Sequence, residues 1–338
     1  MNKKLIHKII FTLISIVIAS SFFGYKAKHN IRFASIAQKG TTPIEVMEDL
    51  RKEVLEETNG EVDIKIYAGN QGDEATIIRK IRTGRLQSAG FTGRGLGEIA
   101  PVMRVMELPF MFNSYDEIDY IVEQMYDRFS AEFEKNGYKL MGWTEVGFVY
   151  IFSKDPIRKV SDLKGVKMWM WEGDPLVKAL FEEVDVVPTA LAITDVLTSL
   201  QTGLIDAVYS SPYGAIALQW HHKTKYMLEL PITNAAGAVV IEKKTFDSIP
   251  ENYQRILLDS FKKWMRELVV RTRQDNERAI ETIRNRGIEI IKAPTGEDLQ
   301  VFERTAVKVR EKMTGKLYPK EVIEEVLRHL EDFRNNNK

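Results

Sequence analysis

Short apolar runs alternate with amphipathic segments along the N-terminal part of the chain. Residues 31–36 and 62–67 have the pattern typical of strands, and an amphipathic helix is predicted between them at 42–57. A second helix is predicted at 72–84, followed by a short apolar segment at 89–91. This repeated strand–helix–strand order predicts a parallel α/β sheet with binding sites at the strand ends.

A second α/β unit follows a break in the pattern. A long strand at 140–152 ends where Ser153-Lys154-Asp155-Pro156 interrupts it, and a later strand at 236–241 is expected to cross back to the first unit. Between them the pattern predicts a strand at 166–171, helices at 174–183 and 195–202, and a strand at 207–210. The predicted division is a signal peptide at 1–27, lobe I at 28–152 plus 239–290, lobe II at 153–238, and C-terminal helices at 291–338 packing on the lobes.

One predicted helix is longer than either lobe. Its apolar positions recur every three or four residues from Pro250 to Arg286, and Gly287 ends it. At 1.5 Å per residue it extends about 54 Å, so it is expected to span both lobes. Two amphipathic helices at 297–313 and 319–333 complete the chain.

The N-terminus carries the features of an export signal. Lys3, Lys4 and Lys8 precede an uncharged apolar run at 9–19, which is too short to span about 30 Å of hydrocarbon comfortably. Small residues allow cleavage after Ser21, and an uncleaved anchor is the alternative. The prediction is an exported, periplasmic protein, and no later stretch reaches the length of a membrane span.

Composition excludes several classes of function. Lys plus Arg (48) equals Asp plus Glu (48), which leaves no basic excess for nucleic acid. The absence of cysteine excludes disulfides, thiolate metal sites, cysteine nucleophiles and a lipoprotein anchor. No nucleophile elbow, Walker loop or zinc-protease motif is present. Gly93-Arg94-Gly95-Leu96-Gly97 has the wrong spacing for a dinucleotide loop, and adjacent His221 and His222 are poorly placed to chelate one ion. No cofactor and no metal are predicted.

Aromatic side chains gather at predicted strand ends in both halves of the chain. Core packing explains single members of this set equally well, but several together suggest the walls of a ligand cleft. The set is Phe91, Phe110, Trp143, Trp169, Trp171, Tyr213 and Trp220.

Several segments give the chain a family resemblance from Ile31 to about Phe333. They are Glu107-Leu108-Pro109-Phe110-Met111-Phe112, Gly142-Trp143, Asp162-Leu163-Lys164-Gly165-Val166-Lys167-Met168, Leu200-Gln201-Thr202-Gly203-Leu204-Ile205-Asp206-Ala207 and Ile249-Pro250. The chain resembles the DctP-type solute-binding proteins of tripartite ATP-independent periplasmic (TRAP) transporters. The resemblance implies an α/β, bilobal periplasmic-binding-protein fold with two mixed or parallel sheets flanked by helices. One long helix is implied to span both lobes. It also implies a small-molecule ligand, TRAP membrane permease subunits as partners, and no covalent chemistry. A monomer and a dimer both fit.

The chain departs from the family at three positions. The family arginine that usually binds a ligand carboxylate is replaced by Trp169, and a second polar position is occupied by Val149. Ser211 precedes Pro212 where the family often has asparagine. A carboxylate closed into a cleft without a cation loses several kcal/mol of solvation. The expected ligand is therefore apolar or aromatic, held against Trp169 and Trp171, which share one strand face.

Alternatives remain open at this stage. Arg94 or Arg104 could bind an organic acid while Trp169 only fills space, and Glu172 could receive an amine or simply cap a helix. An ABC-importer binding protein, a secreted enzyme using Glu145 or Glu172, and an exported sensor are the other classes. The residues expected to contact the ligand are Ser35, Gln71, Phe91, Thr92, Arg94, Phe110, Trp143, Val149, Trp169, Trp171, Glu172, Ser210, Ser211, Tyr213, Trp220 and Asn234.

Overall fold

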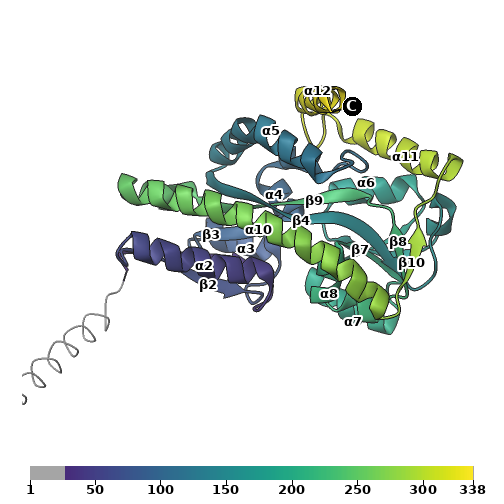
Figure 1. Cartoon of the computed structure of the whole chain (residues 1–338), viewed down its shortest axis with the longest axis horizontal. Coiled ribbons are helices and arrows are strands. Elements are labelled where there is room, and N and C mark those ends of the chain that lie inside the picture. The colour runs from purple at the N-terminus through teal and green to yellow at the C-terminus, as the bar shows by residue number, and fades with distance from the viewer. Residues whose placement is uncertain (1–26, 338) are drawn as a thin grey trace, which may run out of the picture.

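Strands and intervening helices build both halves of the molecule, as the sequence pattern predicts (Figure 1). The computed structural model describes residues 27–337; the predicted signal peptide therefore lies almost wholly outside the described residues. The strands are β1 (His29–Ser35), β2 (Val62–Ala68), β3 (Ser88–Thr92), β4 (Tyr138–Ser153), β5 (Lys167–Trp171), β6 (Val187–Leu191), β7 (Ala207–Ser210), β8 (Tyr226–Glu229), β9 (Thr233–Glu242) and β10 (Glu289–Lys292).

Helices cover the faces of these strands. The α-helices are α2 (Thr42–Glu57), α3 (Glu74–Arg82), α4 (Gly93–Ile99), α5 (Tyr115–Lys135), α6 (Pro175–Glu183), α7 (Val196–Thr202), α8 (Pro212–Ala217), α9 (Lys243–Asp247), α10 (Glu251–Asn285), α11 (Glu297–Met313) and α12 (Lys320–Asn336). Short 3₁₀ segments are η1 (Pro101–Glu107), η2 (Val160–Leu163), η3 (Ile193–Asp195) and η4 (Trp220–His222). None of the helices between residues 27 and 337 is long and apolar enough to cross a membrane.

The strands follow the order β2-β1-β3-β9-β4-β7-β5-β6, with β8 joining β4 to β10. Pairing is parallel within β2-β1-β3 and within β7-β5-β6, and antiparallel where β9 and β4 meet their neighbours. We call the half built on β1, β2 and β3 lobe I, and the half built on β5, β6 and β7 lobe II. The two predicted sheets form one hydrogen-bonded path because the 16-residue β4 pairs with β9 in lobe I and with β7 and β8 in lobe II.

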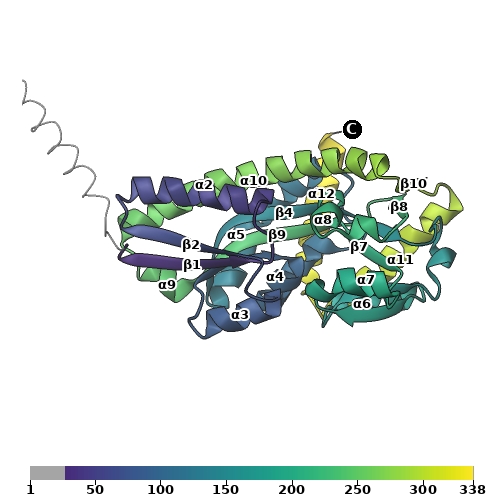
Figure 2. The same cartoon turned by 90° about the horizontal axis from the view of Figure 1, so that it is seen from below.

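The predicted long helix is confirmed. Helix α10 has 35 residues and packs against α2, β4 and α8, so it runs along both lobes (Figure 2). Its buried stripe is apolar at Leu257, Phe261, Met265 and Leu268, with Ser260 among them, is polar at Thr272 and Asn276, and ends with Ala279 and Ile283. Asn276 contacts β4 through Val146 and α8 through Tyr213.

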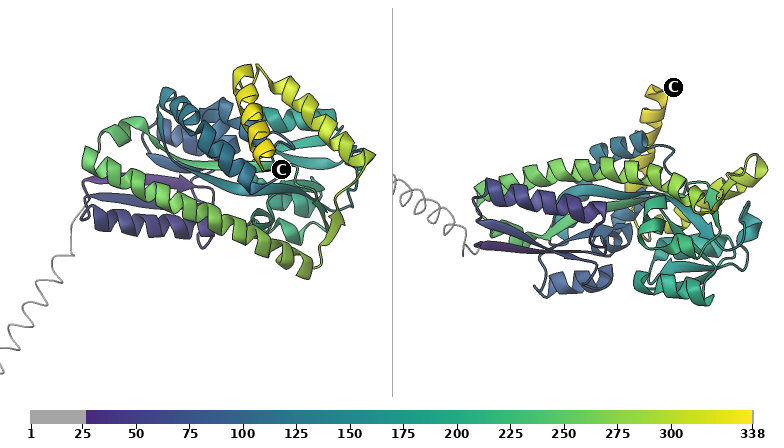
Figure 3. Two further views of the ribbon diagram at one scale, coloured as in Figure 1. Left: turned by 45° about the horizontal axis from the view of Figure 1, so that its top comes forward. Right: turned by 60° about the horizontal axis from the view of Figure 1, so that its bottom comes forward.

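Helix α5 was not predicted. Its N-cap Ser114 accepts a hydrogen bond from the Glu117 backbone, and its buried side chains recur at helical spacing: Ile118, Ile121, Met125, Phe129 and Phe133. These apolar positions are visible in the sequence, so their period alone could have indicated the helix. Helix α12 packs against α5, whereas α11 packs against α6 (Figure 3). The C-terminal helices thus contact both lobes.

Candidate functional site

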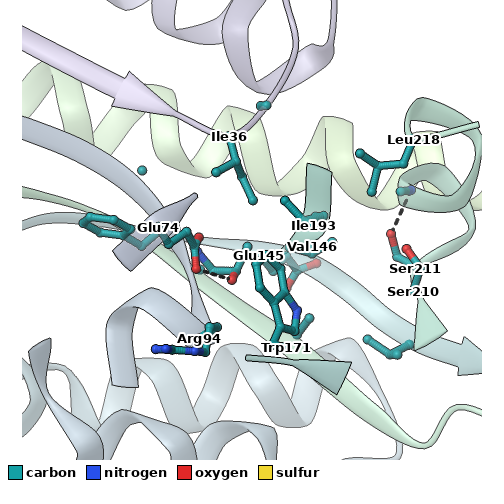
Figure 4. A pocket seen from close by; sticks show the side chains of 18 of the residues that line it. Ile36, Glu74, Arg94, Glu145, Val146, Trp171, Ile193, Ser210, Ser211 and Leu218 are labelled. Carbon is teal, nitrogen blue, oxygen red and sulfur yellow. Dashed lines mark hydrogen bonds between the residues drawn. The ribbon is translucent and has the colours of Figure 1, made fainter. Parts of the chain in front are cut away.

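A cavity of about 350 Å³ lies between the lobes. Lobe I contributes the ends of β1 and β3 and the starts of α2 and α4, and lobe II contributes the end of β5 and the β7–α8 turn. Parallel strands place their carboxyl ends at one edge of a sheet, which explains why ligand cavities form there. Figure 4 shows Glu74 and Arg94 on one side of this cavity, Ser210 and Ser211 on the other, and Trp171 between them.

An aromatic cluster forms the lobe II wall. Trp169 stacks on Tyr209 at 5.0 Å between ring centroids and meets Trp171 at 5.1 Å and Trp220 at 5.0 Å. The indole N–H of Trp169 donates to the Leu191 carbonyl at 3.1 Å. Trp169 is 2% exposed, whereas Trp171 is only half-buried. Trp169 therefore supports the wall from behind, and Trp171 offers its ring to the cavity.

Hydroxyl groups stand at the N-terminus of α8. The Ser211 hydroxyl accepts from the Gly214 backbone N–H at 3.1 Å and so caps the helix. A Cβ at Gly214 would lie 2.6 Å from the Ser210 Oγ, so a larger residue there would displace that hydroxyl. The Tyr213 hydroxyl accepts from the Thr42 backbone N–H at 3.2 Å, which joins lobe II to lobe I across the cavity.

Arg104 is fully engaged by two carboxylates. Its terminal nitrogens donate to Asp174 of lobe II at 3.0 and 3.1 Å. Its Nε lies 2.8 Å from Oε2 of Glu107, an ionic contact without good hydrogen-bond alignment. Burial raises the pKa of Glu107 to about 7, although Arg104 and the Ala236 backbone N–H favour its charged form. The guanidinium is 3% exposed and has little freedom to bind a ligand carboxylate.

Arg94 is more accessible than Arg104. Its Nη1 lies 3.2 Å from Glu98, and its Nε and Nη2 donate to the Glu172 backbone carbonyl at 3.2 and 3.1 Å. The side chain is 17% exposed and lines the cavity. Arg94 thus links α4 to the β5–α6 loop and is the more available of the two lining guanidinium groups in the described chain.

Sequence reasoning missed the buried Glu74. This carboxylate, 1% exposed, accepts from Thr92 N at 2.6 Å, Thr92 Oγ1 at 2.9 Å and Gly95 N at 2.8 Å. Burial raises its pKa to about 7. In the sequence, Glu74 directly after Gly72-Asp73 indicates only the start of a helix, where acids are favoured.

The glycines at 93, 95 and 97 have a packing role. A Cβ on Gly93 would lie 2.0 Å from the Glu107 carboxyl group, and one on Gly97 would lie 2.7 Å from the Arg104 side chain. On Gly95 it would lie 2.6 Å from the Phe91 ring and 2.9 Å from Glu74. The repeated glycines therefore let α4 approach the buried polar groups behind the cavity.

Most of the sequence-predicted ligand residues line the cavity. These are Ser35, Phe91, Thr92, Arg94, Val149, Trp169, Trp171, Ser210, Ser211, Tyr213 and Trp220. Their contact with a ligand stays a prediction. The lining also contains four carboxylates that were not among the predicted ligand residues: Glu74, Glu107, Glu145 and Asp174. Glu145 had been considered only as a residue of a possible enzyme.

Two predicted aromatic residues lie outside the lining. Trp143 packs edge-on against Phe129 at 5.7 Å in the lobe I core. Phe110 packs against Phe302 of α11 at 6.1 Å between ring centroids, whereas its neighbour Pro109 lines the cavity. Strand-end position alone did not distinguish them because the direction of each ring depends on tertiary packing.

Three predicted polar residues also lie outside the lining. Gln71 accepts from Lys80 through its side chain and its backbone carbonyl, at 3.0 and 2.8 Å. Glu172 is exposed, and its backbone carbonyl accepts a hydrogen bond from Arg94, which lines the cavity. Asn234 is 2% exposed, and the residues on either side of it in β9, Thr233 and Ala235, line the cavity instead.

The histidine pair belongs to a different region. The His221 and His222 rings lie 3.9 Å apart, His221 Nδ1 contacts the Ala215 carbonyl at 3.1 Å, and its Nε2 contacts Arg286 at 2.6 Å. Across residues 27–337, no group of three potential metal ligands comes together.

Comparison with known proteins identifies the family. The model described as "Bacterial extracellular solute-binding protein, family 7" (DctP) matches residues 33–316. The 2,3-diketo-L-gulonate-binding periplasmic protein of Escherichia coli is 24% identical over 243 residues, 70% of this chain and 73% of that protein. The C4-dicarboxylate-binding periplasmic protein of Rhodobacter capsulatus is 20% identical over 266 residues, 77% and 79% of the two chains.

Solved structures share the fold. A TRAP periplasmic solute-binding protein of Desulfovibrio salexigens with bound orotic acid superposes with a TM-score of 0.82 at 20% identity, covering 90% of this chain and 98% of that one. The family model spans both lobes, all the segments that carried the sequence resemblance, and the cavity between them. As that resemblance predicted, the chain belongs to the DctP family of bacterial extracellular solute-binding proteins, which bind solutes for transport and are not enzymes.

Proposed function

We propose that this chain is the periplasmic receptor of a TRAP transporter, which captures a small solute between its lobes and delivers it to membrane permease subunits. Membership of the DctP family supports this role, and so does the fold shared with solved TRAP receptors. The cavity at the strand ends supplies a place for the solute. Export through the signal sequence at 1–27 would bring the receptor to the periplasm.

We further propose that the ligand has an apolar or aromatic body that packs on Trp171. The observation that carries this proposal is the Trp169–Trp171–Tyr209–Trp220 cluster. It includes Trp169, the position at which the family resemblance implies an arginine. Arg104 is already saturated by Asp174 and Glu107. Burying apolar surface contributes about 25 cal/mol of binding free energy for each Å² removed from water. A flat ligand packed on Trp171 would therefore gain most of its affinity here.

An organic acid is the second candidate, and Arg94 favours it. This guanidinium lines the cavity and is partly exposed, and only Glu98 pairs with it ionically. The names of similar proteins point the same way, since they bind 2,3-diketo-L-gulonate, C4-dicarboxylates and orotic acid. An aromatic acid would use both features at once, with its ring on Trp171 and its carboxylate toward Arg94.

Native mass spectrometry of the protein as purified, followed by denaturing extraction, tests the proposal. A stoichiometric apolar or aromatic molecule is the expected result. Release of a non-aromatic polyhydroxy acid instead would contradict the aromatic proposal and favour Arg94.

A matched pair of probes separates the two candidates if the protein is isolated empty. Phenylacetate and its uncharged amide, phenylacetamide, differ mainly in charge, and calorimetry measures both with the variants Trp171→Ala and Arg94→Gln. We expect Trp171→Ala to weaken both probes about tenfold, which corresponds to about 1.4 kcal/mol of lost ring contact. A loss confined to phenylacetate in Arg94→Gln, with Trp171→Ala unchanged, would assign the site to acids. Tyr126→Ala, a substitution of an exposed tyrosine on α5, is the control.

A further inference from the structure

The cavity between the lobes reaches into the core of lobe I. Helices α2 and α10 lie side by side along one face of the lobe I strands, and the apolar side chains between these elements form one buried cluster (Figure 2). Several members of this cluster also line the cavity. We call this part of the cavity the lobe I recess, and its lining residues are Phe33 of β1, Met47 of α2, Gly90 of β3, Val239 of β9 and Leu268 of α10.

The lining changes from polar to apolar on the way into the recess. Parallel strands place their carboxyl ends at the cleft, so earlier residues of β1 and β3 lie deeper in lobe I. Helix α2 begins shortly after the end of β1, so its later residues also lie deeper. Pairs of lining residues, written from the cleft inwards, are Ser35 and Phe33, Thr92 and Gly90, Thr41 and Met47, and Thr272 and Leu268. The recess therefore has a polar mouth and an apolar interior.

A glycine of the sheet leaves room for the recess. Gly90 pairs with Val239, and directly paired residues present their side chains on the same sheet face. A Cβ on Gly90 would lie 3.3 Å from Cζ of Phe33 and 3.8 Å from Cγ2 of Val239. Gly90 is not among the residues with a positive φ, so the backbone itself does not require glycine there. A larger side chain at position 90 would therefore occupy the recess between Phe33 and Val239.

The chemistry of the recess favours one kind of occupant. Its side chains are hydrocarbon, apart from the thioether of Met47, and offer no strong hydrogen-bond donor or acceptor. A hydroxylated carbon placed there would lose its hydrogen bonds to water without replacing them, whereas a methylene group gains by leaving water. The apolar residues that α6 adds to the cavity in lobe II directly follow Asp174, whose carboxylate binds Arg104. An alkyl chain there would lie beside a buried ion pair, so lobe I is the better place for it.

We propose that the solute carries an unbranched aliphatic chain, which lies in the lobe I recess. This proposal rests on the proposed receptor function and narrows the solute to an amphiphile. Thr92 and Arg94 stand two and four residues after Gly90 and line the same cavity, so a polar head at the mouth and a tail in the recess fit together. Trp171 then packs against the part of the solute that remains in the cleft.

A series of straight-chain carboxylates tests the recess without knowledge of the natural solute. Calorimetry measures butanoate, hexanoate and octanoate with protein that native mass spectrometry shows to be empty. We expect the affinity of wild type to rise about fourfold for each added methylene group, the effect of burying that group. Gly90→Val fills the recess and should bring the ratio of octanoate to butanoate affinity close to one. Trp171→Ala should weaken all three carboxylates and leave that ratio unchanged.

A second variant enlarges the recess and has a matched control. Met47→Ala removes a side chain from the lining, so it should strengthen decanoate relative to butanoate. Met125→Ala makes the same substitution at a buried methionine of α5, which belongs to a separate core cluster and does not line the cavity. This control should keep the wild-type dependence on chain length. Equal far-ultraviolet circular dichroism spectra show that the variants are folded.

Two results would overturn the recess proposal. One is equal affinity of wild type for butanoate and octanoate, and the other is a rise with chain length that neither Gly90→Val nor Met47→Ala alters. In both cases, weakening of phenylacetamide by Trp171→Ala would still support the proposed function. A chain-length dependence that is lost in Gly90→Val, together with phenylacetamide binding that Trp171→Ala does not change, would support the recess and contradict packing on Trp171.

Discussion

Two carboxyl groups of the cavity lining are withdrawn from water. Glu74 and Glu107 are both buried, and burial raises the pKa of each to about 7. Glu74 accepts hydrogen bonds from neutral N–H and O–H donors, and the Arg94 charge acts on it more weakly, whereas Glu107 faces Arg104 directly. Folding therefore favours the protonated form of both groups at mildly acidic pH.

The stability of the fold should depend on pH because the pKa of Glu74 differs between the folded and unfolded states. Glu74 has a pKa of about 7 when folded and 4.5 in its ordinary state, so the folded protein binds more protons between these values. Its contribution is fully present below pH 4.5 and is lost as pH rises through 7. Since one pKa unit corresponds to about 1.4 kcal/mol, urea unfolding should show a loss of up to about 3 kcal/mol from this group between pH 5 and pH 8.

Glu74→Gln isolates that contribution. Glutamine cannot titrate, and its NH₂ group would face one of the donors that now serve the carboxylate. The variant should be less stable than wild type at pH 5, with a smaller loss of stability toward pH 8. Glu57→Gln, at an exposed position, should keep the wild-type slope. Equal slopes in wild type and Glu74→Gln would refute the proposed linkage.

At the scale of elements, the start of α6 ties helix formation to contact between the lobes. Asp174 accepts from the backbone N–H groups of Leu176 and Val177 at 3.0 and 3.2 Å, and the same carboxylate binds Arg104 of lobe I. An N-cap side chain contributes about 1 kcal/mol, whereas removing one partner of a buried ion pair costs about 3–5 kcal/mol. The tertiary contact therefore outweighs the local one.

Two substitutions separate these contributions. Asp174→Asn keeps a capping oxygen and removes the charge, and Asp174→Ala removes both. In urea unfolding, Asp174→Asn should lower the free energy of unfolding by most of the ion-pair cost of about 3–5 kcal/mol. Asp174→Ala should lower it by about 1 kcal/mol more. If asparagine restored the stability of wild type, the ion pair with Arg104 would have no net role and the cap alone would explain the residue.

At the scale of the whole molecule, the lobes share their central elements. Strand β4 pairs with strands of both halves, β9 pairs with β4 from residue 138 to residue 149, and α10 packs on both lobes. A break in any of these removes hydrogen bonds and apolar contacts from lobe I and lobe II together. Independent unfolding of one lobe would leave half of β4 and half of α10 without partners, so we expect the lobes to unfold as one unit.

Calorimetry measures this cooperativity. The described chain should give a single transition whose calorimetric enthalpy equals the van't Hoff enthalpy, the criterion for two-state unfolding. Asp174→Ala should lower the midpoint of that transition without splitting it. Two separated heat-absorption peaks would show that the shared strand and helix do not couple the lobes.

Local pattern was enough to determine much of this protein. The strand at 207–210 and the helix at 42–57 have the predicted bounds, and α10 begins and ends within one residue of its prediction. These elements are read correctly because periodicity, proline and glycine act over a few neighbouring residues. The family segments along the chain also identified the DctP family before any fold was known. The helix at 115–135 was missed although its buried apolar side chains recur at helical spacing.

Only the tertiary structure decided which side chains meet. Trp169 and Trp143 look alike in sequence, yet one supports the cavity wall and the other packs in the lobe I core. In the sequence Arg104 is available to bind a ligand, whereas in the structure it pairs with Asp174, which is 70 residues away along the chain. The glycines of α4 are explained only by the Glu107, Glu74 and Arg104 side chains that pack closely against them. Sequence determined the elements because their causes are local, whereas pairing, burial and pKa depend on contacts between distant segments that no local pattern contains.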